Sequence, residues 1–202
     1  MLKKLRCVQK TTRISENPNV PPGQYVTEKF PILTFGFIPQ IDINNWHVRV
    51  FGAVVEEVIM DWNKFMSLRK ITVTSPFHCV TQWSRLRNMW TGVPFSDIVK
   101  YVGLKSEARY VMVHCFGGYT TNLSLDVLLA DDVLLAYELD GQLLSSEHGG
   151  PMRLVVPNRY GWKSAKWVNG LEFMHKDSPG FWEQRGYNMR GDPLKEERFS
   201  DS

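Results

Sequence analysis

The chain has 202 residues, of which 43% are hydrophobic and 12% aromatic, so it can bury roughly two-thirds of its unfolded surface in one compact domain. The formal net charge is +3, and the excess lies near the N-terminus, at Lys3, Lys4, Arg6, Lys10 and Arg13. Because the remaining charges are close to balance, the chain lacks the basic stripe of a nucleic-acid binder, and no nucleic-acid partner is expected.

The first 28 residues read as a loosely ordered arm, since they mix charge, Asn, Pro and Gly without a period. From Phe30 onward the texture is globular. Residues 46–52 alternate apolar and polar side chains as a half-buried strand does, and 54–59 is expected to follow as a second strand. Together the two strands predict a hairpin.

Three helices are expected, each with a recognisable start. Asp61 can cap a helix that runs to about Leu68. Pro94 suits the first turn of a second helix, whose apolar side chains fall at i, i+3, i+4 and i+7 and which ends at Gly103. The third covers about 125–130, behind a serine cap.

Short apolar runs predict further strands at 71–74, 110–113, 133–139 and 152–156. Strands outnumber helices without a regular βαβ alternation, so the fold class is α+β, with a β-rich mixed-sheet core and short helices. The main globular domain is expected to span 29–176. The polar tail at 177–202 carries aromatic residues and is expected to wrap the body.

Export and membrane insertion are not expected. Residues 1–20 are interrupted by polar and charged side chains throughout, and the richest apolar stretch, 123–139, contains four acidic residues. The chain has an odd and sparse set of cysteines, Cys7, Cys79 and Cys115, which gives no disulfide framework. These features predict a cytoplasmic protein.

Cys79 is a candidate reactive or metal-binding residue. It lies in the run Pro76-Phe77-His78-Cys79-Val80-Thr81-Gln82-Trp83-Ser84-Arg85, as expected of a loop that leaves a strand. Arg85 nearby would lower the pKa of its thiol. The plainer interpretation is a small buried hydrophobe, which is what a lone cysteine at the end of a β-run most often is.

Two other chemistries remain open for the cysteines. His78-Cys79 and His114-Cys115 suggest a zinc site, but adjacent residues of a strand point to opposite faces, so neither pair easily chelates one ion. A cysteine hydrolase would need a histidine beside Cys79 in space, which spacing alone does not show.

Basic side chains gather between residues 148 and 166, interleaved with glycine and proline; they are His148, Arg153, Arg159, Lys163 and Lys166. Scattered cations usually mark a solvated face. Glycines, however, allow close backbone approach, and a glycine-rich loop with Arg and Lys suits a phosphate. The pattern is neither a Walker A loop nor a Gly-x-Gly-x-x-Gly turn, so an ordinary nucleotide is not indicated.

From about Phe30 to Phe173 the chain resembles the molybdopterin-binding catalytic domain of the sulfite oxidase family. Cys79 stands where that family places its single protein ligand to molybdenum. Residues 148–153 read His-Gly-Gly-Pro-Met-Arg, which is similar to the family pattern His-Gly-x-Pro-x-Arg. Residues 46–52 and 134–143 resemble two of its strand segments.

The resemblance implies a molybdenum-molybdopterin cofactor and no haem in this chain. The cofactor-binding residues would be Thr34, Cys79, His148, Arg153, Ser164, Ala165 and Lys166. The catalytic residues would be Cys79, the metal ligand, with Arg85 and Lys163; Arg159 is a further candidate to attract a polar or anionic oxygen substrate.

Departures from the family pattern bear on the substrate. Leu33-Thr34-Phe35-Gly36 stands in place of Arg-Asn-x-x, and Cys79-Val80-Thr81-Gln82 in place of Cys-Ala-Gly-Asn, so the sulfite-binding arginines are partly missing. The run Cys79-Val80-x-x-Trp83-Ser84 resembles the bacterial branch that includes the catalytic subunit of the periplasmic methionine sulfoxide reductase.

The sequence thus predicts two-electron oxygen-atom transfer on a small substrate such as sulfite or a sulfoxide. The enzyme is expected to be a monomer that exchanges electrons with a separate partner. The alternative is a non-catalytic module of the same fold that binds a pterin or a partner protein.

Overall fold

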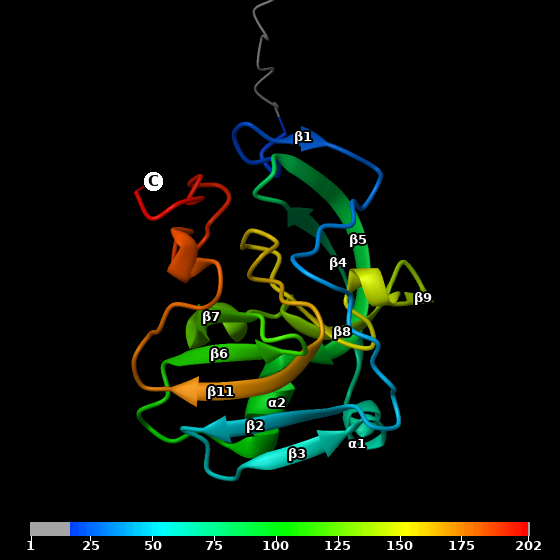
Figure 1. Ribbon diagram of the computed structural model, residues 1–202, viewed down its shortest axis with the longest axis vertical. Coiled ribbons are helices and arrows are strands. Elements are labelled where there is room, and N and C mark those ends of the chain that lie inside the picture. Colours follow the sequence, from blue (N-terminus) through cyan, green and yellow to red (C-terminus); the bar gives the residue numbers. More distant parts are fainter. Residues whose placement is uncertain (1–16, 202) are drawn as a thin grey trace, which may run out of the picture.

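The computed structural model describes residues 17–201, which form two β-sheets with short helices beside them (Figure 1). Both sheets mix parallel and antiparallel pairs, which confirms the predicted α+β class with a β-rich mixed-sheet core. The basic cluster at residues 3–13, together with Cys7, lies outside the described residues. Within residues 17–201, no helix has the length and apolar character that crossing a membrane requires.

The five-stranded sheet runs in the order β3-β2-β11-β6-β7. Its strands are β3 (Val58–Asp61), β2 (His47–Gly52), β11 (Val168–Met174), β6 (Tyr110–Cys115) and β7 (Thr120–Ser124). Strands β2 and β11 pair in parallel, and the other neighbours are antiparallel. Alternate side chains of β2, Val48 and Val50, are fully buried in the core, as the predicted alternation requires.

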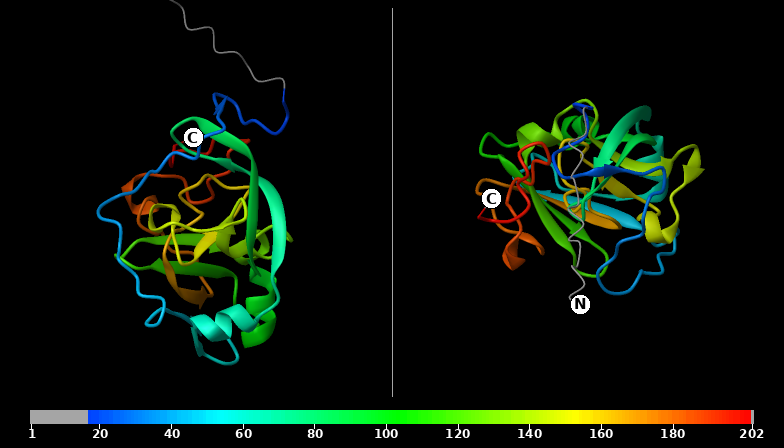
Figure 2. Two further views of the ribbon diagram at one scale, coloured as in Figure 1. Left: turned by 90° about the vertical axis from the view of Figure 1, so that its right-hand side faces the viewer. Right: turned by 90° about the horizontal axis from the view of Figure 1, so that it is seen from above.

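The second, six-stranded sheet carries the site. Its main path is β1 (Tyr25–Val26), β5 (Trp83–Pro94), β8 (Leu134–Leu139) and β10 (Arg153–Val155); β4 (Ile71–His78) pairs with β5, and β9 (Gln142–Leu143) with β8. Strands β4 and β5 form a long hairpin that curves along one side of the molecule (Figure 2). Cys79 lies in the turn of this hairpin.

The helices fill the space beside and between the sheets. Helix α1 (Trp62–Ser67) begins after Asp61, whose carboxylate accepts the Lys64 N–H at 2.7 Å. Helix α2 (Phe95–Val102) buries Phe95, Ile98 and Val102 in a core cluster to which both sheets contribute. Short turns complete the set: α3 (Leu125–Leu128), η1 (Ser146–His148) and η2 (Glu183–Arg185).

Several elements differ from the sequence prediction. The strand predicted at 54–59 begins only at Val58, and Pro94 is the N-cap of α2 and not part of its first turn. The strands β1, β5, β7 and β11 were not predicted. Strand β5 reads Trp-Ser-Arg-Leu-Arg-Asn-Met-Trp-Thr-Gly-Val-Pro, which follows no simple alternation because it pairs with partners on both edges and bends along its length.

Both predicted terminal segments contact the body. Within the predicted arm, Tyr25 and Val26 form β1, which pairs in parallel with β5, so this described part is an ordered strand. In the tail, the Phe181 N–H donates to Thr120 O at 2.9 Å, and Gly191 O accepts the Tyr160 N–H at 2.8 Å. Figure 1 shows the tail, in orange and red, beside β7 and next to the segment that follows β10.

Candidate active site

A cavity of ≈ 360 Å³ lies where the Cys79 turn meets the basic, glycine-rich segment. The Gly161 N–H donates to His78 O at 2.7 Å, which joins the two runs across about 80 positions of sequence. All the residues predicted to bind the cofactor line this cavity: Thr34, Cys79, His148, Arg153, Ser164, Ala165 and Lys166. Residues from four separate parts of the chain therefore meet at one place.

The turn between β4 and β5 presents the Cys79 thiol to the cavity. The Cys79 N–H donates to Trp83 O at 2.9 Å, and Gln82, with a φ of 72°, closes the turn by donating to Cys79 O at 3.1 Å. The thiol sulfur lies 3.1 Å from Thr81 Oγ1, and the residue is 8% exposed. Such a turn holds the thiol in one place beside a neighbouring hydroxyl.

The expected lowering of the Cys79 pKa by Arg85 is not found. Burial raises the pKa of the Cys79 thiol; its hydrogen bond to Thr81 and the charge of Arg198 act in the opposite direction. Arg85 is engaged elsewhere, since its guanidinium donates to Asp140 Oδ2 at 2.6 Å. A thiol with a raised pKa stays largely in its neutral form, so a metal that bound it would have to displace its proton.

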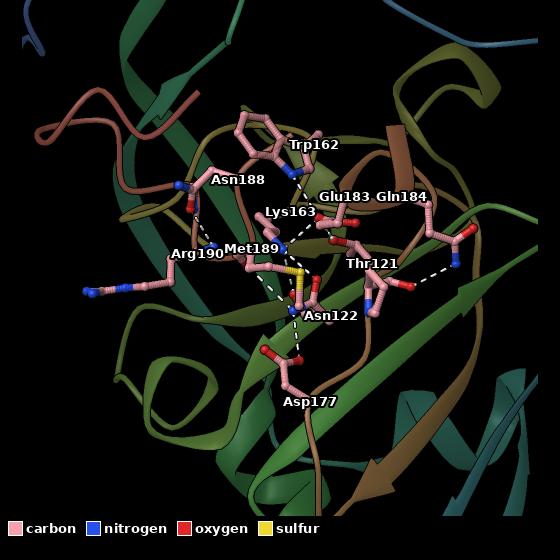
Figure 3. A network of polar contacts seen from close by, with 12 residues as sticks. Thr121, Asn122, Trp162, Lys163, Asp177, Glu183, Gln184, Asn188, Met189 and Arg190 are labelled. Atoms are coloured by element: carbon pink, nitrogen blue, oxygen red, sulfur yellow. Dashed lines mark hydrogen bonds and ion pairs between the residues drawn. The ribbon is translucent and has the colours of Figure 1, made fainter. Parts of the chain in front are cut away.

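Two of the three predicted catalytic residues do not line the cavity. Arg85, in β5, donates hydrogen bonds to Asn88 Oδ1 at 2.9 Å and to Asp140 Oδ2 at 2.6 Å. Lys163 is fully buried, and its ammonium lies 2.6 Å from Glu183 Oε1 and within 2.9 Å of both oxygens of Asn122 (Figure 3). An ammonium has three donors, so Lys163 has none left for a substrate. The further candidate, Arg159, donates to Asn158 O and is also outside the cavity lining.

Arg153 is a buried cation at the polar end of the cavity. It is 3% exposed, and its guanidinium donates to His148 O at 2.9 Å and to Ser164 O at 2.8 Å. Burial lowers the pKa of Arg153 to about 9. Its Nε is buried without a hydrogen-bond partner, and it takes part in none of the ion pairs between residues 17 and 201.

Lys166 lies beside Arg153 and also has only neutral acceptors. Its Nζ donates to Thr34 Oγ1 at 2.7 Å, to Glu147 O at 2.8 Å and to Leu33 O at 2.9 Å. Burial, followed by the charge of Arg153, lowers the pKa of Lys166 to about 8. Two cations that repel each other and form no ion pair with a carboxylate attract an anion, although the nearby charge of Glu147 partly offsets that of Lys166.

Gly149 allows Arg153 and Lys166 to pack closely around it. Its φ is +104°, and a Cβ there would lie 2.9 Å from Lys166 Cγ and 3.1 Å from Arg153 Cβ, so a side chain would push the two cations apart. His148 precedes it, with Nε2 3.2 Å from Phe30 O; burial lowers the pKa of His148. A glycine thus suits this position of the motif, because a side chain there would clash with Lys166 and Arg153.

The remaining wall is mostly aromatic and was not predicted from the sequence. Its aromatic residues are Phe30, Phe35, Phe77, Trp83, Tyr119, Trp162, Trp167, Trp182 and Tyr187, and Pro31, Leu33, Val80, Thr81, Glu147 and Gly161 complete it. Trp182 and Tyr187 belong to the tail; the aromatic residues of an otherwise polar tail were the available signal. The cavity therefore combines two cations with aromatic walls, and the Arg153 guanidinium lies 5.3 Å from the centre of the Phe77 ring.

The zinc alternative has no support in the described part of the chain, which contains no group of three or more His, Cys, Asp and Glu side chains placed to hold a metal. His78 is engaged with Ser84 Oγ at 2.8 Å, and burial lowers its pKa to about 4. The neutral imidazole is thus part of the packed core next to the turn.

Fold and cavity define a mixed-sheet protein with a thiol and an anion-attracting pocket in one cavity. Residues 35–182 match the family described as "Oxidoreductase molybdopterin binding domain", and the chain belongs to this family. It is 44% identical over 192 residues to the uncharacterized oxidoreductase YuiH of Bacillus subtilis, with 95% of this chain and 97% of that protein covered.

More distant similarities support the same family and fold. The chain is 28% identical over 205 residues to the sulfite oxidase of Arabidopsis thaliana, covering 83% of this chain and 52% of that enzyme, so it spans about half of that relative's length. Among solved structures, the sulfane dehydrogenase SoxCD from Paracoccus pantotrophus superposes with a TM-score of 0.65 at 21% identity, over 74% of this chain and 42% of that chain. This last likeness supports the sulfite-oxidase-type fold.

Proposed function

We propose that this protein is a molybdenum-cofactor oxidoreductase that transfers an oxygen atom to or from a small substrate, with Cys79 as the protein ligand to molybdenum. One observation carries the proposal: the buried Cys79 thiol, the buried Arg153 and the half-buried Lys166 line the same cavity, and neither cation forms an ion pair with a carboxylate among residues 17–201. When bound, the cofactor supplies two-electron oxygen-atom transfer. The chain supplies the ligand, the anchor and the pocket.

The residues present fit a pterin that ends in a phosphate. The unpartnered Nε of Arg153 offers a charged donor, and Lys166 adds a second positive charge to the cavity lining, while its ammonium already donates to three neutral oxygens. A phosphate there would pair both cations and offset their mutual repulsion. Gly149 allows the backbone to approach, and the aromatic rings of Phe77 and Trp167 offer flat surfaces to a ring system.

Within this proposal, Arg153, Lys166 and Thr34 orient the cofactor, and Ser164 supports them from behind. The Ser164 hydroxyl accepts the Val156 N–H at 2.9 Å, and Ser164 O accepts from Arg153 at 2.8 Å. The segment that binds the phosphate is therefore tied to the end of β10. This bonding fixes the donors before a ligand arrives, which limits the ordering cost of binding.

Near Cys79 the cavity favours a neutral, polarisable substrate. Arg85 and Lys163, the predicted anion-attracting groups, are paired elsewhere, and the wall there is formed by Tyr119, Trp182 and Tyr187. Aromatic faces and edges bind sulfur groups well. Of the two substrates predicted, a sulfoxide therefore fits better than sulfite. A separate electron-transfer partner remains part of the proposal.

The test is a comparison of Cys79→Ser with Cys115→Ser, using protein from a host that makes the cofactor. Cys115 is the other free cysteine of the described region, buried in the core away from the cavity. Wild type and Cys115→Ser should carry about one molybdenum per chain and reduce a methyl sulfoxide, whereas Cys79→Ser should fold and lose turnover. Retained turnover in Cys79→Ser would remove this residue from the mechanism.

Two further outcomes separate the alternatives. Wild-type protein without molybdenum, pterin or phosphate would favour the non-catalytic binding module. Rapid reaction of Cys79 with iodoacetamide in the loaded protein, with matching loss of activity, would favour the cysteine hydrolase, because a thiolate bound to metal is protected from alkylation.

A further inference from the structure

One buried carboxylate joins the tail to the segment that carries the cofactor-binding residues. Glu183 is 7% exposed, and its Oε1 lies 2.6 Å from Lys163 Nζ, 3.0 Å from Trp162 Nε1 and 3.1 Å from Thr121 Oγ1 (Figure 3). Three charged or polar donors thus converge on a single oxygen. Because Lys163 and Glu183 are both fully buried at their side chains, removing either leaves an unpaired buried charge.

Backbone contacts press the tail against the same place. A Cβ at Gly180 would lie 2.6 Å from Thr121 Cα and 2.7 Å from Thr120 O, so the tail rests directly on β7. A Cβ at Gly191 would lie 2.8 Å from Trp162 Cζ2. These positions tolerate no side chain without a shift of the tail.

Trp162 is held by contacts to the tail and to two tyrosines of the body. Its ring stacks on Tyr160 at 5.3 Å and meets the edge of Tyr187 at 5.0 Å, while its Nε1 is bound by Glu183. Its carbonyl accepts the Tyr119 hydroxyl at 2.6 Å. Trp162, Tyr119 and Tyr187 all line the cavity.

The tail also reaches the Cys79 turn. Arg198 donates from Nη1 to Val80 O, next to Cys79, at 2.6 Å, and its guanidinium lies 4.9 Å from the centre of the Tyr160 ring. The tail thus borders the site on two sides: Trp182 and Tyr187 form its wall, and Arg198 secures the turn.

From these contacts we propose that Glu183 is a positioning residue, which holds Trp162, and through it Tyr187 and Trp182, in place as the substrate-side wall of the cavity. The inference rests on the proposed function for the meaning of that wall. Glu183 itself touches no substrate; it acts through the rings it positions. The same bonds occupy Lys163, so a lysine within the cofactor segment belongs to the latch of the tail.

The first measurement needs no cofactor. The full chain is made in a host that lacks the cofactor, and the rate of iodoacetamide modification is followed separately for the Cys79 and Cys115 peptides by mass spectrometry. In Glu183→Gln we expect Cys79 to react at least about tenfold faster. Lys163 then loses its buried carboxylate partner, which lowers the free energy of local opening around the cavity by at least the amount that corresponds to a tenfold change in rate. Cys115 should stay slow, since it is buried in the main hydrophobic core and does not line the cavity.

A second variant guards against simple unfolding. Lys163→Met combined with Glu183→Leu removes both buried charges, a replacement that usually keeps a protein folded, yet it takes the acceptor from Trp162 Nε1. It should show the same faster reaction at Cys79. Asp97→Asn, which breaks ion pairs to Arg69 and Lys100 far from the cavity, serves as the control and should match wild type.

The loaded enzyme gives the second readout. Both latch variants should raise KM for the sulfoxide about tenfold with kcat changed less than about twofold, as expected when binding is loosened and the reacting centre is kept. Unchanged Cys79 reactivity in both variants would overturn the proposal, as would equal acceleration at Cys79 and Cys115. If molybdenum is absent from wild type, the proposed function fails, while the alkylation result still decides the role of Glu183.

Discussion

Lys163 and Lys166 lie three positions apart in the sequence, but their ammonium groups have different partners. The Lys163 ammonium bonds to Glu183 and to Asn122 and is closed off from the cavity. The Lys166 ammonium opens into the cavity and bonds only to neutral oxygens, beside the equally unpaired Arg153. Burial alone does not separate a structural cation from a ligand-binding one; the presence of a carboxylate partner does.

The difference extends to the lining of the cavity. Arg153 and Lys166 line it without forming an ion pair within residues 17–201, whereas the ring of Trp162 is held by Glu183, whose charge is already paired with that of Lys163. A structural ion pair should therefore govern stability, and unpaired cations should govern ligand affinity.

Lys163→Met should cost about 3–5 kcal/mol of unfolding free energy, because it leaves Glu183 buried without its cation. For a chain of this size that corresponds to a fall in Tm of about 6–20 °C. Urea denaturation and thermal melts measure both. A loss below about 1 kcal/mol would contradict the view of this pair as a structural latch.

Lys166→Met should have the opposite profile. Cofactor affinity should fall about 10- to 100-fold, the contribution of one charge-assisted contact. Stability should change by less than about 1 kcal/mol, because the variant loses hydrogen bonds but also a costly buried charge. Pterin content after purification and a melt of the cofactor-free protein give the two numbers; a Lys166 variant as unstable as the Lys163 variant would erase the distinction.

Gly149→Ala should lower cofactor content and cost about 1–2 kcal/mol of stability, because φ is +104° and the new Cβ meets Lys166 Cγ at 2.9 Å. Gly117→Ala is its matched control: φ there is +83°, but no atom lies within 4 Å of a Cβ. Both variants should lose stability through backbone strain. Only the Gly149 variant should lose cofactor, and equal losses would show that strain alone is responsible.

The smallest effect is on pH dependence. The pKa of Lys166 is lowered to about 8, and an anion prefers its charged form, so anion affinity should fall as pH rises through about 8, at most about tenfold per unit. Folding shows the reverse sign: between about 8 and 10.5 the unfolded chain holds the proton that the folded one has released, so this group's contribution to stability rises with pH. Lys166→Met should flatten both profiles.

Much of the fold could be predicted from local pattern. The alternation in β2, the cap at Asp61 and the apolar spacing of α2 are set within a few residues, where local sterics and burial dominate. Strand β5 was missed, because it is paired on both edges and curves, so its side chains follow the demands of β4 and β8 more than a period of two.

The site divided in the same way. His148, Arg153 and Lys166 could be found because they lie within one glycine-rich run, and Cys79 because its run resembles a family motif. Arg85 and Lys163 were assigned to catalysis on the same grounds, yet each has a partner distant in sequence: Asp140 for one and Glu183 for the other. No local pattern announces such a partner.

The sequence by itself determined the mixed β class, the family and the run of residues that can hold a cofactor, since these follow from short-range periodicity and from motifs a few residues long. Only the tertiary structure decided which cations are available, because that depends on whether a carboxylate from another part of the chain arrives beside them. It also placed the tail against the cavity, where Trp182 and Tyr187 form the wall. Charge pairing and burial depend on which residues are neighbours in space, and residues distant in the sequence become neighbours only when the chain folds.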